Sequence, residues 1–175
     1  MEAHEIIQIA AFIPDYQSGA GHSVKIYYRD GSIHWLQCSF RSFIKNLAKT
    51  FAVNLQEARR RYGPVIGSKN LIPLVLTPFL LFVPLKARKP LVPGDPAYGY
   101  FRLRSVQDVI SSPPSCLLLL EGGHKLPIIQ SYRATCSHLR KARKLEAYLL
   151  EQYIQLMDHE ANVELMQKTM SKDRQ

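Results

Sequence analysis

The stretch Cys116–Ser131 reads CLLLLEGGHKLPIIQS and carries the clearest fold signal in the chain. Two short apolar runs flank Glu121-Gly122-Gly123, and glycines between such runs are typical of a tight β-hairpin turn. After this stretch the chain has no Pro or Gly, and apolar residues recur every three or four positions from Leu139 to Leu156. The pattern predicts a hairpin followed by one long amphipathic helix over residues 131–168.

The part of the chain before this stretch repeats the hairpin pattern. The β-rich runs 23–28 and 32–38 flank an Asp30-Gly31 turn, which predicts a second hairpin. The apolar residues that follow are spaced by three and four, which predicts a helix over 39–51. Ser39 or Ser42 is the expected N-cap of this helix.

Proline and glycine divide the middle of the chain. A second short helix is expected from Asn54 to Tyr62, with Asn54 as N-cap and Gly63-Pro64 as its stop. Because prolines then exclude a helix, residues 73–76 and 79–83 are expected to form short strands. Residues 84–96 are interpreted as a basic, proline-rich loop, and residues 98–110 as a strand with turn material after it.

These elements predict the α+β class. The expected architecture is a single domain with a β-rich core of antiparallel hairpins, one or two short helices and a long C-terminal helix. The run 6–13 supplies a further expected strand that ends at Pro14. Residues 1–144 are expected to form a basic α+β domain, residues 131–168 the long helix, and residues 169–175 a disordered tail.

The net charge of +9 is unevenly distributed along the 175 residues. Residues 1–24 contain three acidic residues and no Lys or Arg, and residues 145–175 contain six acidic and three basic residues. Residues 25–144 contain 20 basic and only five acidic residues. A basic middle of this kind predicts a polyanionic partner, either nucleic acid or an anionic membrane surface.

Several other classes of protein are not expected. The sequence has no phosphate-binding glycine loop, no nucleophile elbow and no paired-histidine metal motif, so no catalytic residue, metal site or cofactor is predicted. The three cysteines are far apart, which argues against a zinc site or a disulfide framework. The most apolar stretch, Leu71–Leu85, is shorter than the about 20 residues of a membrane helix and contains three prolines. We therefore expect a cytoplasmic protein that does not interact with membranes.

The basic residues fall into three groups. Arg41, Lys45 and Lys49 are spaced to form a row on one helical face, and Arg59-Arg60-Arg61 follows them. A second group surrounds the proline-rich strands, where Arg102 and Arg104 alternate and are expected to project from one strand face. The third lies in the long helix. Solvated surface charge is the alternative reading of each group. The side chains expected to contact DNA are Arg59, Arg60, Arg61, Lys69, Lys86, Arg88, Lys89, Arg102, Arg104 and Arg140.

The order of these motifs resembles the ComK competence transcription factor family. The resemblance covers roughly residues 59–150 and rests on the ordered set rather than on any one motif. Its matching segments are Arg59–Gly63 with Gly67–Lys69, then Ile72–Pro78, Phe79–Pro84, Tyr98–Phe101 and Leu120–Tyr132. A second likeness, to LytTR DNA-binding domains, covers only about residues 98–140.

The ComK resemblance implies a bacterial transcription activator of DNA-uptake genes that binds paired A/T-rich boxes as an oligomer, with contacts in the minor groove. The expected partner is double-stranded DNA, and no small-molecule substrate is expected. The long helix turns acidic after Lys144, which suits contact with protein rather than DNA. Its apolar stripe is expected either to pack on its own domain or to pair with another copy. The alternative functions are a LytTR-type DNA-binding regulator and an RNA-binding or scaffold protein without transcriptional activity.

Overall fold

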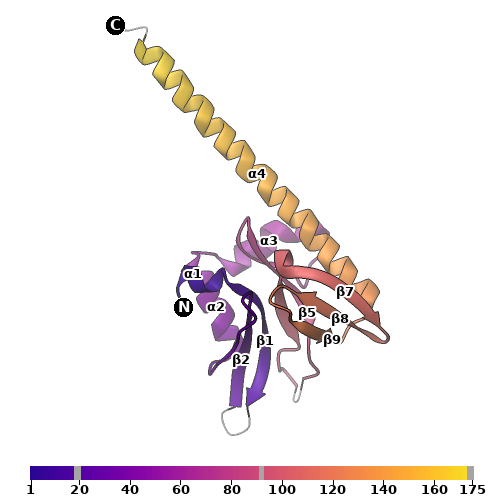
Figure 1. Cartoon of the computed structure of the whole chain (residues 1–175). Helices are drawn as coiled ribbons and strands as arrows, with labels where there is room; N and C mark the ends of the chain where they lie inside the picture. Colours follow the sequence, from indigo (N-terminus) through magenta and orange to yellow (C-terminus); the bar gives the residue numbers. More distant parts are fainter. Residues whose placement is uncertain (18–20, 91–92, 173–175) are drawn as a thin grey trace.

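The computed structural model describes residues 1–17, 21–90 and 93–172 as one α+β body with a projecting helix (Figure 1). Its elements, in chain order, are α1 (Ala3–Ile6), β1 (Ile9–Gln17), β2 (Gly21–Tyr28), β3 (Ile33–Leu36), α2 (Phe40–Thr50), α3 (Leu55–Ile66), β4 (Leu74–Thr77), β5 (Leu80–Lys86), β6 (Tyr98–Arg102), the 3-10 helix η1 (Leu103–Ser105), β7 (Val106–Ser112), β8 (Ser115–Leu120), β9 (Lys125–Ile128) and α4 (Tyr132–Lys172).

Two antiparallel sheets form the β-rich core. The larger has six strands in the order β3-β2-β1-β6-β5-β4, and the smaller has three in the order β7-β8-β9. Side chains alternate between the two faces of the six-stranded sheet, because successive residues of a strand point to opposite sides. Phe12 and Phe82 thus enter one buried cluster, while Ala11 and Val83 enter another.

The helix α2 covers the first of these faces. Its residues Phe40 and Phe43 place their rings 5.7 and 5.0 Å from the ring of Phe12, and Leu47 is fully buried beside them. Ser39 caps the helix by accepting a hydrogen bond from the Ser42 N–H. The expected helix and its Ser39 cap are therefore confirmed, and its apolar stripe faces the sheet.

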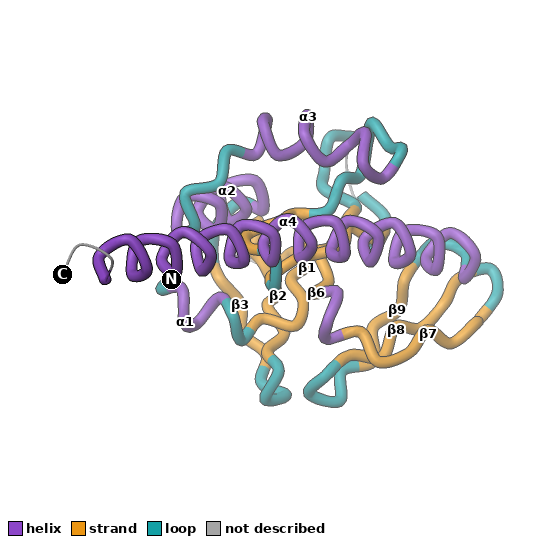
Figure 2. The backbone as a smooth tube through the Cα atoms, turned by 90° about the horizontal axis from the view of Figure 1, so that it is seen from above, coloured by secondary structure: helices purple, strands orange, loops and turns teal. Residues whose placement is uncertain are grey.

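The opposite face of the large sheet packs against the small sheet and the N-terminal half of α4. Leu139, Ala142, Leu145 and Leu149 are buried in this second cluster. Seen from above, α4 runs the length of the molecule with β7–β9 beneath its first half (Figure 2). Of the two roles expected for its apolar stripe, packing on its own body is confirmed for this half.

Both predicted hairpins are present, as β2–β3 and β8–β9, but several expected boundaries are wrong. The strand expected over 98–110 is divided by η1 into β6 and β7, which lie in different sheets, and β5 continues through Pro84 into the expected loop 84–96. The helix α3 keeps its Asn54 cap yet passes through Gly63-Pro64 and ends at Gly67. Pro64 lies in the last turn, where it removes a single helical hydrogen bond. Gly67, at φ 61°, then adopts the left-handed conformation that ends the helix, and Ser68 N–H bonds to the Gly63 carbonyl.

The N-terminal and C-terminal boundaries also differ from expectation. Residues 3–6 are helical, and β1 runs through Pro14 instead of ending there. Because β1 pairs with β6 only at Ala11 and Phe12, its β6 side is unpaired at Pro14, so the backbone N–H that proline lacks is not needed for a hydrogen bond to β6. Helix α4 covers residues 169–172, which the sequence assigned to a tail, and the remaining residues of that tail lie outside the described part. No helix within the described ranges has the length and hydropathy of a membrane span.

Candidate nucleic-acid interface

The outward face of α2 carries a row of three cations. Because the opposite face is buried on the sheet, the i, i+4, i+8 spacing leaves Arg41, Lys45 and Lys49 exposed to solvent. Along the helix axis the row extends about 12 Å, at about 1.5 Å per residue. No hydrogen bond or ion pair to these three side chains is found within the described residues.

The start of α3 turns this row into one wall of a groove of about 480 Å³. The Asn54 side chain accepts hydrogen bonds from the Gln56 and Glu57 N–H groups at 3.0 and 3.2 Å, which fixes where α3 begins. Arg59, on the next turn, faces the groove with no acidic partner among the described residues. The groove lining contains four cations and no Asp or Glu. We call this the basic groove and define it by Arg41, Lys45, Lys49 and Arg59.

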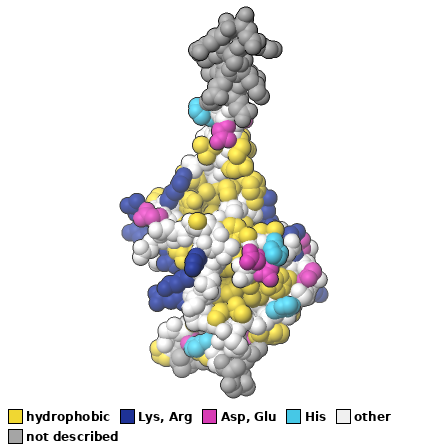
Figure 3. All heavy atoms as spheres, turned by 90° about the vertical axis from the view of Figure 1, so that its left-hand side faces the viewer, with side chains coloured by type: hydrophobic (Ala, Val, Ile, Leu, Met, Phe, Trp, Pro, Cys, Tyr) yellow, Lys and Arg dark blue, Asp and Glu magenta, His cyan; other side chains and the backbone are white. Residues whose placement is uncertain are grey.

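Figure 3 looks onto the side of the molecule that carries α1 and α2. Dark blue Lys and Arg side chains are most numerous on the left of this face, where an acidic patch also lies among them, and most of the other Asp and Glu atoms lie on the right. Like charges on neighbouring walls of a groove add their fields and attract polyanions. The arrangement therefore suits phosphate groups.

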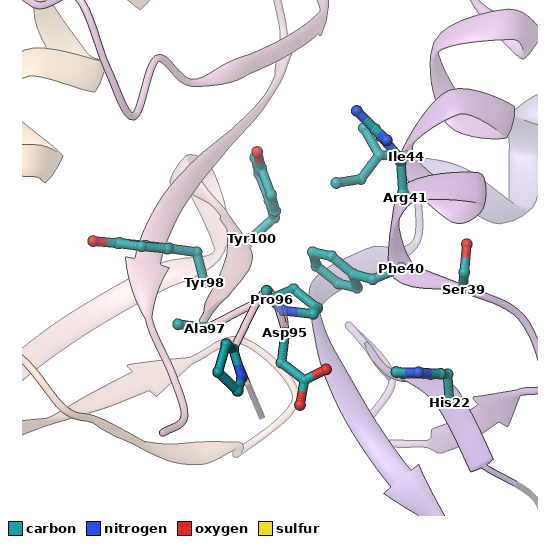
Figure 4. A pocket seen from close by; sticks show the side chains of 12 residues that line it. His22, Ser39, Phe40, Arg41, Ile44, Asp95, Pro96, Ala97, Tyr98 and Tyr100 are labelled. Carbon is teal, nitrogen blue, oxygen red and sulfur yellow. The ribbon is translucent and has the colours of Figure 1, made fainter. Parts of the chain in front are cut away.

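A second hollow, of about 760 Å³, adjoins the basic groove between α2 and β6 (Figure 4). Tyr98 and Tyr100 of β6 line this hollow together with Phe40 and Arg41 of α2, and Figure 4 shows the Tyr98 ring pointing away from α2. The ring of Tyr100 stacks on Phe12, with centroids 5.3 Å apart. Burial raises the pKa of the Tyr100 hydroxyl, and the charge of Arg59 acts in the opposite direction. We call this hollow the tyrosine pocket.

The three consecutive arginines of α3 point in different directions, because successive helical residues are rotated by about 100°. Arg59 lines the basic groove. Arg60 pairs with Glu57 at 2.8 Å, and both side chains are well exposed. Arg61 donates a hydrogen bond of 2.8 Å to Gln152 of α4. The run predicted as one DNA-contacting unit thus contributes one residue to the groove.

Three other predicted DNA contacts, Arg88, Arg102 and Arg104, are engaged within the protein. Arg88 lies 3.6 Å from Asp95 and 4.8 Å from the ring of Tyr16, with little of its side chain exposed. Arg102 donates to the carbonyl of Ile7, and burial lowers its pKa. These arginine side chains form contacts within the protein and stabilise its fold.

The expectation that Arg102 and Arg104 share one strand face is wrong. The strand β6 ends at Arg102, and the chain turns through η1, so that Arg104 points instead toward α4. There its Nε donates to Glu146 at 2.6 Å, and its guanidinium lies 5.4 Å from the ring of Phe79. The alternation rule applies only while the strand continues.

The remaining predicted contacts lie apart from the basic groove. Lys69, Lys89 and Arg140 are exposed, Lys86 is half-buried at the end of β5, and none of the four lines the groove. In contrast, the α2 row belonged to no set of expected DNA contacts, although its spacing was visible in the sequence. The signal that could have found it was the absence of any acidic residue between Ser32 and Gln56.

No protein-family model, curated protein or solved structure matches this chain. Within the described residues, no three His, Cys, Asp or Glu side chains gather as they would around a metal ion. The basic groove and the surfaces beside it are therefore the features of this chain that bear on its function.

Proposed function

We propose that this chain is a DNA-binding transcription regulator whose phosphate contacts come from the basic groove. The observation that carries the proposal is the convergence of four cations from two helices on one groove, where no described residue forms an ion pair with them and no described Asp or Glu lines the groove. An ordinary charged helix surface intersperses both signs, whereas this face has Arg41, Lys45 and Lys49 without a compensating carboxylate within the described residues.

The geometry favours an extended polyanion over a small one. Three cations in a row of about 12 Å, with Arg59 on the adjoining wall, match a ligand whose charges repeat along its length. Duplex DNA carries about one negative charge per 1.7 Å of its axis. Arginine adds planar, two-pronged hydrogen bonding to phosphate on each wall of the groove, Arg41 from α2 and Arg59 from α3, while the two lysines act as point charges.

The resemblance to the ComK family supports the regulatory part of the proposal. Its first matching segment, Arg59–Gly63, lies in α3, and the first residue of that segment lines the basic groove. On this reading the chain activates DNA-uptake genes and prefers A/T-rich sites. RNA binding is an alternative outcome of the test below.

We also propose that a second copy pairs with this chain through the distal part of α4. The stripe that buries Leu149 against the body continues through Tyr153 and Leu156, and beside it Ile154 and Met157 are 57% and 45% exposed. Figure 3 shows hydrophobic side chains where α4 leaves the body. An apolar stripe that is buried from Leu139 to Leu149 and exposed at Leu156 suits the same stripe of another copy.

The test of DNA binding is fluorescence anisotropy of labelled duplex DNA titrated with the full chain at several salt concentrations. We expect log K to fall steeply with log salt, because each phosphate contact releases counterions. Duplexes rich in A/T and in G/C, and a duplex RNA of matched length, serve as competitors. A flat salt dependence would contradict the proposal. Tighter binding to the RNA duplex would show that RNA, not DNA, is the ligand of the basic groove.

A further inference from the structure

We infer that the tyrosine pocket binds one nucleotide, with its base against the aromatic side chains and its phosphate on Arg41. The pocket volume of about 760 Å³ lies within the range of small-molecule sites, which is about 300–1,000 Å³. The walls come from α2, from β6 and from the described residues 93–97 before β6. This inference goes beyond duplex binding, because it concerns a separate hollow with a different lining.

Aromatic surface supplies one half of the recognition. Tyr98 and Tyr100 line the hollow from β6, Phe40 lines it from α2, and Pro96 lines it from the segment before β6 (Figure 4). Tyr98 has no ring partner within the described residues, whereas Tyr100 is held in place by its stack on Phe12. Base–aromatic stacking is tolerant of sequence, because every base offers a flat π surface. A flat nucleobase is therefore the group that this aromatic lining accommodates best.

Charge supplies the other half. Arg41 lines the pocket at its α2 side and is exposed, and no described residue forms an ion pair with it. The acidic lining residue, Asp95, accepts a hydrogen bond from the Tyr16 hydroxyl at 2.9 Å and pairs with Arg88. Because its charge is already compensated, Asp95 does not oppose an anion in the pocket.

The pocket and the basic groove are continuous. Arg41 and Ile44 line both, so a phosphate bound by Arg41 lies at the junction of the two. A purely apolar ligand would leave Arg41 unused, and a simple anion would leave the tyrosines unused. A planar base joined to a phosphate uses both, which is why we assign a nucleotide.

The nucleotide in the tyrosine pocket can come from two sources. A free nucleoside monophosphate would act as an effector beside the DNA site. A nucleotide unstacked from bound DNA would place its base in the pocket while its neighbours follow the basic groove, at the cost of unpairing one base. The experiment needs one arm for each source.

The first arm titrates the full chain with the four nucleoside monophosphates and with the matching nucleosides by calorimetry. We expect monophosphates to bind more tightly than nucleosides, and Arg41→Gln to reduce that preference. Tyr98→Ala should weaken binding by about 5- to 150-fold, the loss of one base–aromatic stack, while Tyr98→Phe keeps it. The control is Tyr132→Ala, which removes an exposed tyrosine of α4 outside the pocket.

The second arm places 2-aminopurine, a fluorescent base sensitive to stacking, in duplex and single-stranded DNA. A fluorescence change that Tyr98→Ala abolishes assigns the pocket to a nucleotide of the strand, and binding in the first arm alone assigns it to a free nucleotide. Absence of both signals in the wild-type chain overturns the inference. Tyr98 does not line the basic groove and carries no charge, so the salt dependence of duplex binding, measured on the same variant, reports separately on the proposed function.

Discussion

Neutralising the basic groove should remove a defined part of the salt dependence of DNA binding. The perturbation is the fourfold change of Arg41, Lys45, Lys49 and Arg59 to Gln, which keeps the length of the side chains and removes four charges. All four side chains are exposed and have no ion pair within the described residues. We therefore expect the fold and its thermal stability to change little, as is usual for surface substitutions.

The magnitude follows from counterion release. Each cation that neutralises a duplex phosphate contributes about 0.9 to the slope of log K against log salt, so four contribute about 3.6. Between about 50 and about 200 mM salt this accounts for a roughly 150-fold fall in wild-type affinity. The fourfold variant should lose that part of the slope. If the wild-type and variant affinities converge at about 1 M salt, the variant should bind about 4,000-fold more weakly than the wild type at about 0.1 M salt.

The assay is fluorescence anisotropy of one labelled duplex over that salt range. A matched control neutralises four exposed cations elsewhere, so that the net charge changes equally; its residues are Lys125, Arg133, Arg143 and Lys144. We expect the control to keep most of the slope. If the two variants lose the same slope, binding follows net charge rather than the groove, and if neither loses as much as one unit, the reasoning is refuted.

Four further outcomes follow from named contacts. Phe82→Ala should lower the free energy of unfolding by about 3–5 kcal/mol in a urea titration, because this fully buried ring joins the α2-side cluster; an unchanged midpoint would contradict that packing. Asn54→Ala should cost about 1 kcal/mol through the lost cap of α3, and Asn54→Asp should restore most of it. The Arg29 hydrogen bond lowers the pKa of Glu121, so this ion pair stabilises the fold at neutral pH and its contribution is lost as pH falls through the lowered pKa; the stability difference between wild type and Glu121→Gln should therefore shrink in acid, and a constant difference would count against it. A chain ending after Tyr153 keeps the buried stripe of α4, so in sedimentation velocity it should remain folded and run as a monomer while the full chain self-associates; two monomers would exclude pairing through distal α4.

The choice of end point in that last experiment depends on the tertiary structure. From charge alone, the acidic segment after Lys144 looks separable from the basic domain. The structure buries Leu145 and Leu149 in the core shared with the small sheet. A chain ending after Lys144 would lose both, so it would report on unfolding rather than on pairing.

Local signals predicted most of the secondary structure. Both hairpins lie where a turn signal separates two β-rich runs, and both short helices begin at the expected caps, Ser39 and Asn54. These signals involve residues close in sequence, and the free energies of turns and caps are set at that scale. The errors occurred where the surrounding structure tolerates a proline that the local rule excludes. Pro14 lies in the part of β1 that pairs only with β2, and Pro64 lies in the last turn of α3.

The candidate site was less predictable, because the availability of a charged side chain depends on distant residues. Arg88 reaches Pro14, Arg102 reaches Ile7 and Arg104 reaches Glu146, across 74, 95 and 42 residues of chain. From the sequence alone, all three arginines look available to bind a ligand. By contrast, the divergence of Arg59, Arg60 and Arg61 follows from helical rotation alone and was available from the sequence.

The sequence by itself therefore determined the α+β class, the caps, the two hairpins and a row of cations on α2, since each depends on periodicity or on a few neighbouring residues. Only the tertiary structure decided which cations are used inside the protein and which remain exposed, and only it set Arg59 beside that row and the two tyrosines of β6 next to it. The physical reason is that a periodic pattern fixes which way a side chain faces on its own element. Its partners are fixed by how the elements pack.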